Sequence, residues 1–251
     1  MDKGIILITG ATSGIGLATA ELLAENGYPL ILTGRRTDRL DILKNRLDKL
    51  TPVHILGFDI RVMDEVLKAV DSLPAEWREI SVLVNNAGLA AGLDHFHEAD
   101  MGDWEQMIDT NIKGLLYITR KISPGMVERG TGHIINVGSI AGREMYEKGN
   151  VYSATKHAVE ALTKGMRIDM LKHGIKVSTV SPGLVETEFS LVRFRGDSEK
   201  AQQPYRGMIP LAGRDVAEAI LFIITRPPHV CVQDLLIMPS AQAAALKVHR
   251  E

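Results

Sequence analysis

The sequence is poor in cysteine and lacks any long apolar run. Its single cysteine, Cys231, rules out a disulfide within the chain, and we expect it to be a small apolar residue near a late strand. No apolar run approaches the roughly 18 residues that a membrane-spanning helix needs. The run nearest the amino end, Ile5–Ile8, is too short for a signal peptide. We therefore expect a cytoplasmic protein with no membrane partner.

The sequence also lacks an excess of either charge. It carries 29 Lys and Arg against 31 Asp and Glu, a formal net charge of −2. Because nucleic-acid-binding domains carry a basic excess, this balance predicts no nucleic-acid partner. With 45% hydrophobic and 24% charged residues, the chain has the composition of a globular protein with a real core. It has no internal repeat, low-complexity segment or linker, so we predict a single domain over residues 1–251.

Short apolar runs alternate with amphipathic stretches along the whole chain. This alternation is typical of βαβ units and predicts an α/β fold, a doubly wound Rossmann-type parallel sheet of about seven strands flanked by helices. The predicted strands are Gly4–Thr9, Pro29–Thr33, Pro52–Phe58, Ile80–Val84, Gly132–Val137, Lys176–Ser181 and Asp234–Met238. The predicted helices are Ile15–Asn26, Leu40–Leu50, Val62–Leu73, Asp103–Lys121, Asn150–His173 and Arg214–Thr225.

A glycine-rich turn follows the first predicted strand. It reads Gly-x-x-x-Gly-x-Gly and leads into a helix, whose amino end offers free N–H groups and a positive dipole end. Glycines let a pyrophosphate approach the backbone, so a turn in this place favours dinucleotide binding over a purely structural role. The spacing departs from the general Gly-x-Gly-x-x-Gly motif. The predicted cofactor residues here are Gly10, Thr12, Ser13, Gly14, Ile15 and Gly16.

Two arginines follow the second predicted strand. Folds that bind NAD carry an acid about 20 residues past the glycine turn, where it holds the ribose hydroxyls. In this chain that place reads Gly34-Arg35-Arg36, and the first acid is Asp38. A guanidinium suits a 2′-phosphate, so we predict that the cofactor is NADP. The alternative is a pair of solvated arginines at the start of a helix.

Tyr152 and Lys156 are four residues apart in a predicted helix, so both side chains lie on one face. A lysine ammonium beside a phenol favours the phenolate, and we expect the pKa of Tyr152 to fall from about 10 towards neutral. A tyrosine tuned in this way is a general acid or base. Ser139 follows a predicted strand, where its hydroxyl can bind the same substrate oxygen. Taken alone, Tyr-x-x-x-Lys is a weak signal that also fits a surface pair.

Several motifs occur together in one order, and their presence favours a catalytic role for Tyr152 and Lys156 over a surface pair. They are Thr9-Gly10-x-x-x-Gly14-Ile15-Gly16, Asn85-Asn86-Ala87-Gly88, Asn111, Ser139, Tyr152-x-x-x-Lys156 and Pro182-Gly183. From Gly4 to about Pro239 the chain resembles the short-chain dehydrogenase/reductase family. Longer runs resemble its subgroup of NADP-dependent 3-hydroxy acid (serine, allo-threonine) dehydrogenases, with sulfoacetaldehyde reductases close by. These runs are Ser72-Leu-Pro-Ala-Glu-Trp, Met107-Ile-Asp-Thr-Asn, Pro124-Gly-Met-Val-Glu-Arg, Val192-Arg-Phe and Val248-His-Arg.

The resemblance implies a sheet with strand order 3-2-1-4-5-6-7 and a reversible hydride transfer between NADP(H) and an alcohol or carbonyl. Ser139 then holds the substrate oxygen, Tyr152 is the general acid/base, and Lys156 lowers its pKa and binds the nicotinamide ribose. Asn111 lies in a distorted helix and completes a proton path through a water. The further cofactor residues that the resemblance implies are Asp59, Ile60, Asn86, Ala87, Gly88, Pro182, Gly183, Val185 and Thr187. Asn86 also braces the central strand.

A segment at about 184–210 shows little periodicity and indicates a mobile lid over the nicotinamide. It contains Arg193 and Arg195, and guanidinium groups suit carboxylate or sulfonate oxygens. We therefore predict a substrate with a negative charge about two bonds from the reacting carbon, bound by Arg193. Arg195 is a second candidate ligand, and the alternative for both arginines is a solvent-facing charge on the lid. Met145 and Tyr146, which follow Ser139, are predicted to wall the pocket.

Four further expectations complete the sequence analysis. His95 and His97 form a His-x-His pattern beside acids, but no second ligand cluster accompanies it, so we expect no metal site. The resemblance implies a homotetramer, with one interface on helices 103–121 and 150–173 and a second on strand 235–238 and the tail 240–251. One alternative function is the NADPH-dependent reduction of sulfoacetaldehyde or another small aldehyde or ketone. Another is a non-catalytic dinucleotide-binding sensor, which needs the glycine turn but not the acid/base residues.

Overall fold

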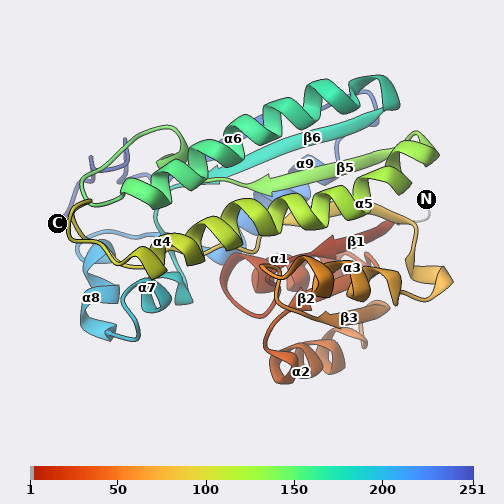
Figure 1. Ribbon diagram of the computed structural model, residues 1–251, viewed down its shortest axis with the longest axis horizontal. Helices are drawn as coiled ribbons and strands as arrows, with labels where there is room; N and C mark the ends of the chain where they lie inside the picture. Colours follow the sequence, from red (N-terminus) through yellow and green to blue (C-terminus); the bar gives the residue numbers. More distant parts are fainter. Residues whose placement is uncertain (1–2) are drawn as a thin grey trace.

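The computed structural model describes residues 3–251, in which seven parallel strands form one sheet with helices on both faces (Figure 1). The strand order is β3-β2-β1-β4-β5-β6-β9, so the predicted order is confirmed. The strands are Ile5–Ile8 (β1), Leu30–Gly34 (β2), Val53–Gly57 (β3), Ile80–Asn85 (β4), Gly132–Val137 (β5), Ile175–Pro182 (β6) and Asp234–Ile237 (β9).

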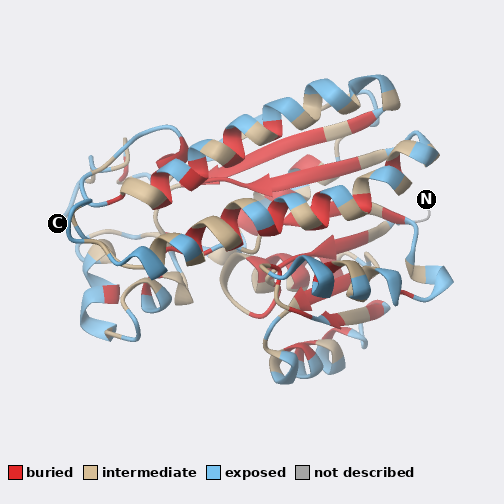
Figure 2. Ribbon diagram, in the orientation of Figure 1, coloured by how far each residue is buried: buried red, intermediate tan, exposed pale blue. Residues whose placement is uncertain are grey.

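The central strands are continuous aliphatic runs because helices cover both of their faces. In β1, Ile6, Leu7 and Ile8 are all fully buried, although alternate residues point to opposite faces. Figure 2 shows the same contrast across the molecule, with buried strands inside and helices exposed only on their outer faces. The sheet therefore holds two separate cores, one on each face.

One face of the sheet carries α1 (Gly14–Glu25), α2 (Thr37–Leu47) and α9 (Gly213–Ile224), whose apolar residues share one core with the strands. The other face carries α3 (Met63–Asp71), α5 (Leu115–Arg129) and α6 (Asn150–Met170). In Figure 1, α5 and α6 cross in front of the sheet and α9 lies behind it. This two-sided covering is the doubly wound arrangement predicted from the sequence.

The helix predicted at 103–121 is longer and less regular than expected. It begins with α4 (Met101–Ile108), passes through a π-helical turn at Asp109–Gly114 and continues as α5. The predicted distortion around Asn111 is present in that turn. The predicted end at Lys121 is wrong, because α5 runs through Pro124 to Arg129. Ile122 and Met126 are buried on either side of the proline, and their packing offsets the roughly 3 kcal/mol that an interior proline costs.

The lid (184–210) is more regular than its sequence indicates. Its short strand β7 (Val185–Glu186) pairs with β8 (Leu211–Ala212), and two short helices follow, α7 (Glu188–Arg193) and α8 (Ser198–Gln202). Thr187 caps α7, since its Oγ1 accepts a hydrogen bond from the Phe189 N–H at 3.3 Å. Helices of five or six residues are too short to show a 3.6-residue period, so the pattern was missed.

The lid and the tail lie together at the carboxyl ends of the strands, the left-hand end of Figure 1. The tail folds back over the lid of its own chain, where the Glu251 N–H donates to the Gly207 carbonyl at 2.9 Å. Nearer the sheet, the Gln242 Oε1 accepts from the Leu184 N–H at 2.8 Å. Ligands of open α/β sheets bind at this end. Within residues 3–251, the helices are all too short or too polar to cross a membrane.

Candidate active site

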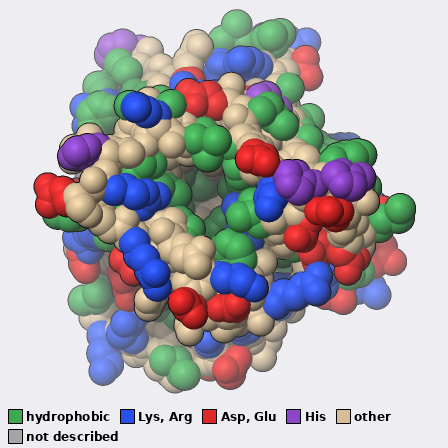
Figure 3. Space-filling view, turned by 90° about the vertical axis from the view of Figure 1, so that its left-hand side faces the viewer, with side chains coloured by type: hydrophobic (Ala, Val, Ile, Leu, Met, Phe, Trp, Pro, Cys, Tyr) green, Lys and Arg blue, Asp and Glu red, His purple; other side chains and the backbone are tan. Residues whose placement is uncertain are grey.

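A cavity of about 620 Å³ opens at the carboxyl ends of the central strands. Figure 3 looks onto this end of the molecule, where the surface is hollowed and Lys and Arg side chains surround the opening. Most of the predicted site residues line the cavity, although they come from nine separate parts of the chain. They are Gly10, Thr12, Ser13, Gly14, Ile15, Arg35, Arg36, Asp59, Ile60, Asn86, Ala87, Gly88, Ser139, Tyr146, Tyr152, Lys156, Pro182, Gly183, Val185, Thr187 and Arg193.

The glycine turn depends on residues without a Cβ. Gly10 and Gly14 have φ angles of 67° and 55°, which side-chain-bearing residues rarely adopt. Gly16 does not line the cavity, but a Cβ on it would lie 2.4 Å from both the Asn86 Nδ2 and the Gly10 carbonyl oxygen. Gly16 therefore lets α1 start directly against the strand ends, which brings its free N–H groups to the cavity.

The ends of β1 and β4 are joined by side chains as well as by the sheet. The Asn86 Nδ2 donates to the Thr9 carbonyl at 2.9 Å and to the Gly10 carbonyl at 3.2 Å. In return, the Thr9 Oγ1 accepts from the N–H groups of Asn86 and Ala87, both at 3.0 Å. Asn86 thus braces the central strand, as the resemblance implied.

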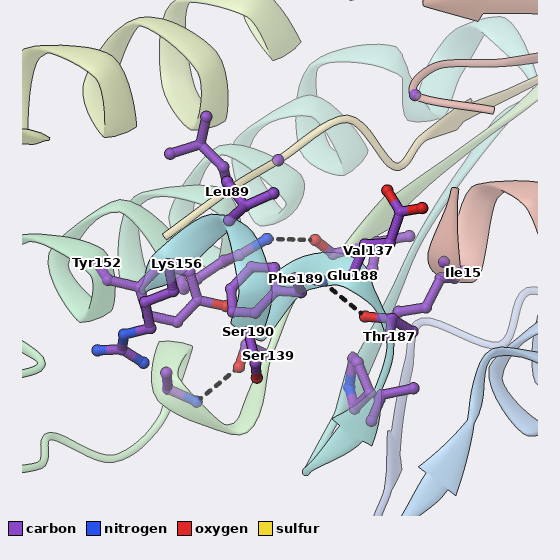
Figure 4. Close-up of a pocket in the computed structure, with 18 of the residues that line it drawn as sticks. Ile15, Leu89, Val137, Ser139, Tyr152, Lys156, Thr187, Glu188, Phe189 and Ser190 are labelled. Atoms are coloured by element: carbon purple, nitrogen blue, oxygen red, sulfur yellow. Dashed lines mark hydrogen bonds between the residues drawn. The ribbon is translucent and has the colours of Figure 1, made fainter. Parts of the chain in front are cut away.

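The three predicted acid/base residues meet on one side of the cavity (Figure 4). Tyr152 and Lys156 lie one turn apart on α6 and Ser139 follows β5, and all three side chains are buried. The Lys156 Nζ donates to the Val137 carbonyl at 2.9 Å. The Phe189 ring from the lid stands edge-on to the Tyr152 ring, with centroids 5.7 Å apart. The three predicted side chains are therefore brought together, and the lid covers them.

The pKa of Tyr152 departs from the sequence-based expectation. Burial raises the pKa of this phenol, and the nearby Tyr146 adds to the rise, which the Ser139 hydrogen bond and Arg193 only partly offset. Lys156 does not lower it here, because the amine has already lost its proton, and with it its charge, in the pH range where the phenol ionises. Burial also lowers the pKa of Lys156 to about 8, against the opposing charge of Glu160. At neutral pH the phenol is therefore protonated, the form that donates a proton.

Asn111 lies outside the cavity, in the π-helical turn, and is buried. Its Nδ2 donates to the Leu89 carbonyl at 2.8 Å and to the Thr155 Oγ1 at 3.0 Å, and its Oδ1 accepts from the Leu89 N–H at 2.9 Å. A Cβ on Gly88 would lie 3.3 Å from the Asn111 Oδ1 and 3.6 Å from the Lys156 Nζ. Asn111 therefore holds the chain that leaves β4 in position. Its side chain and that of Lys156 both lie next to Gly88.

The two predicted phosphate-binding arginines have different surroundings. The Arg36 Nη2 donates to the Thr12 Oγ1 at 2.9 Å and to the Ser13 Oγ at 2.8 Å, so this guanidinium faces the glycine turn. The Arg35 side chain is 54% exposed and lies 3.8 Å from Asp59. Asp59 is also held by Arg61, through a bond of 2.6 Å. Arg36 is therefore the better placed of the two for a phosphate beside the glycine turn.

The sequence analysis missed one more arginine and a glutamate at this end of the cavity. Glu188, the first residue of α7, accepts from Arg36 at 3.0 Å and from Arg39 at 2.8 Å and 3.0 Å. Burial raises the pKa of Glu188, but the bonds from Arg39 and Arg36 outweigh it and hold the pKa below its usual value. Arg39 lies one helical turn after Arg36, and this spacing was the available signal.

At the other end of the cavity, Arg193 is held beside Tyr152. Its Nη1 donates to the Tyr146 hydroxyl and its Nε to the Gly92 carbonyl, both at 3.1 Å. The guanidinium carbon lies 5.8 Å from the centre of the Tyr152 ring. Arg195 does not line the cavity and pairs with Asp103 at 3.0 Å.

Met145 does not wall the pocket, and that prediction is wrong. Its side chain is 60% exposed and does not line the cavity, whereas the next two residues, Tyr146 and Glu147, do. The sequence analysis also missed part of the wall, to which the lid and tail contribute Phe189, Tyr205, Gln242, Ala245, Val248 and Arg250. The run Val248-His-Arg, noted for its resemblance to the subgroup, was the signal for the tail.

The histidine pattern of the loop after β4 has no metal-binding surroundings. The rings of His95 and His97 stack with their centroids 5.9 Å apart. In the part of the chain that the structure describes, no three His, Cys, Asp or Glu side chains gather in a way that holds a metal ion.

Comparison with known proteins identifies the family. Residues 4–196 match the short chain dehydrogenase family. The chain belongs to this family. The NADP-dependent 3-hydroxy acid dehydrogenase YdfG of Salmonella typhimurium is 48% identical over 98% of this chain and 99% of that protein. Sulfoacetaldehyde reductase 2 of Chromohalobacter salexigens is 44% identical over 98% and 99%. The structure of this chain also resembles the closed form of serine dehydrogenase complexed with NADP+. The TM-score is 0.92 and the identity 46%, over 98% of this chain and all of that one.

We predict that replacing Asn111 with alanine destabilises the protein. The change leaves the buried N–H and carbonyl of Leu89 without partners, which costs roughly 2–4 kcal/mol of unfolding free energy. Denaturant unfolding measures this cost. Asn45→Ala is the matched control, because Asn45 is exposed on α2 and its loss should change the free energy by less than about 0.5 kcal/mol. Equal stability of the two variants would contradict the bracing role of Asn111.

Proposed function

We propose that the protein is an NADP-dependent oxidoreductase that transfers hydride reversibly between NADP(H) and a small 3-hydroxy acid or β-hydroxy amino acid and its carbonyl. The observation that carries this proposal is the position of Arg193. Its guanidinium lies 5.8 Å from the Tyr152 ring, in the same cavity as the glycine turn. A family member with a cation beside its acid/base suits an anionic substrate. The names of the relatives point the same way.

The residues at the glycine-turn end of the cavity fit NADP. The positive-φ glycines leave the N–H groups at the start of α1 open to a pyrophosphate, and Arg36 faces the same turn with the charge that a 2′-phosphate requires. Asp59 and Ile60 then flank the adenine, and Lys156 and Tyr152 hold the nicotinamide ribose. The residues assigned to the rest of the cofactor are Asn86, Ala87, Gly88, Pro182, Gly183, Val185 and Thr187.

When bound, NADPH supplies the hydride, and the protein handles the substrate oxygen and its proton. The hydroxyls of Ser139 and Tyr152 bind the carbonyl oxygen of the substrate. Because its pKa is raised, the phenol is protonated and would donate its proton to that oxygen when the carbonyl is reduced. Lys156, with a pKa of about 8, can then return a proton to the phenolate near neutral pH. Oxidation of the alcohol runs through the same groups in reverse.

The charge of the substrate is recognised at Arg193. Tyr146 and the Gly92 carbonyl hold its Nη1 and Nε, which leaves the Nη2 to bind an anion. A carboxylate there lies on the same side of the cavity as Tyr152, so a carbonyl within a few bonds of it meets the acid. The same arrangement suits a sulfonate, and the 44% identity to a sulfoacetaldehyde reductase favours that second candidate substrate.

We expect Tyr152→Phe to lose turnover by roughly 10²–10⁴-fold while binding NADPH normally, because it removes only the proton donor. Stopped-flow or steady-state rates measure the turnover, and NADPH fluorescence measures the binding. Near-normal turnover of the variant would disprove the mechanism.

Arg193→Ala tests the substrate assignment against a panel of serine, allo-threonine, 3-hydroxypropionate, 3-hydroxyisobutyrate and, in reverse, sulfoacetaldehyde. Loss of a bond to a charged group costs about 1.5–3 kcal/mol, so kcat/KM on the anionic substrates should fall about 10–150-fold. An uncharged aldehyde should be much less affected.

Arg195→Ala is the matched control, because that guanidinium pairs with Asp103 outside the cavity. Equal losses of Arg193→Ala on charged and neutral substrates would mean that the arginine only shapes the lid. NADPH binding without turnover of any substrate would instead favour the dinucleotide-binding sensor.

We also propose a homotetramer, and a cytoplasmic location stays a prediction. Large apolar side chains are exposed on the helices named for the first interface, where Ile168 and Leu171 are 75% and 72% exposed. For the second, β9 is a sheet edge and Leu236 on it is 43% exposed. Light scattering should report four chains, and Ile168→Lys should reduce that number. A monomeric mass for the unaltered protein would refute the proposal.

A further inference from the structure

The carboxylate of Glu188 occupies the cationic end of the cavity. It accepts from the Arg36 Nη1 at 3.0 Å, and the Arg39 Nη1 donates to both of its oxygens, at 2.8 Å and 3.0 Å. Arg36 also donates through its Nε and Nη2 to Thr12 and Ser13 at the glycine turn. Two guanidinium groups around one anion are the arrangement that binds a phosphate.

We infer that Glu188 is an internal competitor for the 2′-phosphate of NADP, which displaces the Glu188 carboxylate from Arg36 and Arg39 when it binds. The inference rests on the proposed NADP dependence. It adds Arg39 to the phosphate-binding residues. The contribution of the 2′-phosphate to the affinity for NADP(H) is then the difference between two interaction free energies, that of the phosphate and that of the Glu188 carboxylate with the same pair of arginines.

The two anions compete because both would bind the same two guanidinium groups. Glu188 accepts from the Arg36 Nη1, and the hydroxyls of the turn accept from the Arg36 Nε and Nη2. A phosphate brought to the same guanidinium would lie within a few ångströms of the carboxylate, and like charges at that separation repel. The Glu188 side chain is 42% exposed, so it can move into water and keep its charge hydrated. An exposed ion pair is weak, and a phosphate dianion outcompetes it.

The exchange also frees the beginning of the lid helix from the body of the protein. Glu188 is the first residue of α7, and its two arginine partners lie about 150 residues earlier in the chain, with separations of 152 and 149. The same helix carries Phe189, which covers the Tyr152 ring, and ends at Arg193. A ligand that bears a 2′-phosphate thus releases the tie on the helix that carries the substrate-binding cation.

Calorimetry of two cofactor fragments tests the inference without any turnover. The ligands are 2′,5′-ADP, which carries the 2′-phosphate, and 5′-ADP, which lacks it. Glu188→Gln keeps the shape of the side chain and removes its charge. We expect it to tighten the binding of 2′,5′-ADP by about 3–10-fold, the scale of one or two exposed ion pairs, and to leave 5′-ADP unchanged. Arg39→Gln should weaken 2′,5′-ADP and spare 5′-ADP.

Glu186→Gln is the matched control, because it removes the same charge two residues earlier, at an exposed position outside the cavity. It should leave the binding of both fragments unchanged. Glu188→Ala provides a second removal of the carboxylate if the glutamine itself keeps hydrogen bonds to the arginines.

The outcomes separate this inference from the function on which it rests. Unchanged or weaker binding of 2′,5′-ADP by both Glu188 variants overturns the competition, and so does equal tightening of both fragments. If the unaltered protein binds the two fragments with the same affinity, the NADP assignment itself fails. A preference for 2′,5′-ADP that grows when Glu188 is neutralised supports both.

Discussion

The hydroxyl of Thr9 joins the end of β1 to the chain that leaves β4, and the rest of the site depends on this junction. β1 and β4 are neighbours in the sheet, but the chain leaves β1 towards β2 on one side and leaves β4 towards β5 on the other. A crevice opens where such neighbours diverge. The Thr9 Oγ1 accepts hydrogen bonds from two N–H groups of the chain after β4, at 3.0 Å each. In return, the Asn86 side-chain amide donates to the Thr9 carbonyl. These side-chain hydrogen bonds join the two strand ends beyond the point where the hydrogen bonds of the sheet stop.

The lid helix α7 connects two centres of positive charge across this crevice. Its first residue, Glu188, faces Arg36 and Arg39, and its last residue, Arg193, stands beside Tyr152. Five helical steps separate the two ends, a rise of roughly 7.5 Å. The same cavity contains the buried Lys156, whose charge is costly enough there for its pKa to fall to about 8. One short helix therefore joins the arginines beside the glycine turn to the arginine beside Tyr152.

The sequence predicted what local pattern controls. The aliphatic runs of the strands, the glycine turn and the Tyr152–Lys156 spacing each follow from a period or a residue type, and the structure places them as expected. The errors came where distant contacts decide. Pro124 stays inside α5 because buried neighbours hold the helix, Met145 faces solvent although it adjoins Tyr146, and the Arg39–Glu188 pair joins segments far apart in the chain. The pKa of Tyr152 was misjudged because the spacing shows that a lysine is near, but not that burial raises the pKa of the phenol and lowers the pKa of the lysine.

The π-helical turn at Asp109–Gly114 acts as one extra residue in an otherwise continuous helix. An α-helix advances by about 100° per residue, so the turn rotates α4 by roughly that angle relative to α5. The two halves can therefore pack differently, with α5 against the sheet and α4 against α6 and the loop above the cavity. Shortening the chain by one residue there would give a straighter helix but would turn the apolar face of α4 to solvent. Because of the irregular turn, one continuous helix can pack its α5 half against the sheet and its α4 half against α6, although these neighbours lie on different sides of it.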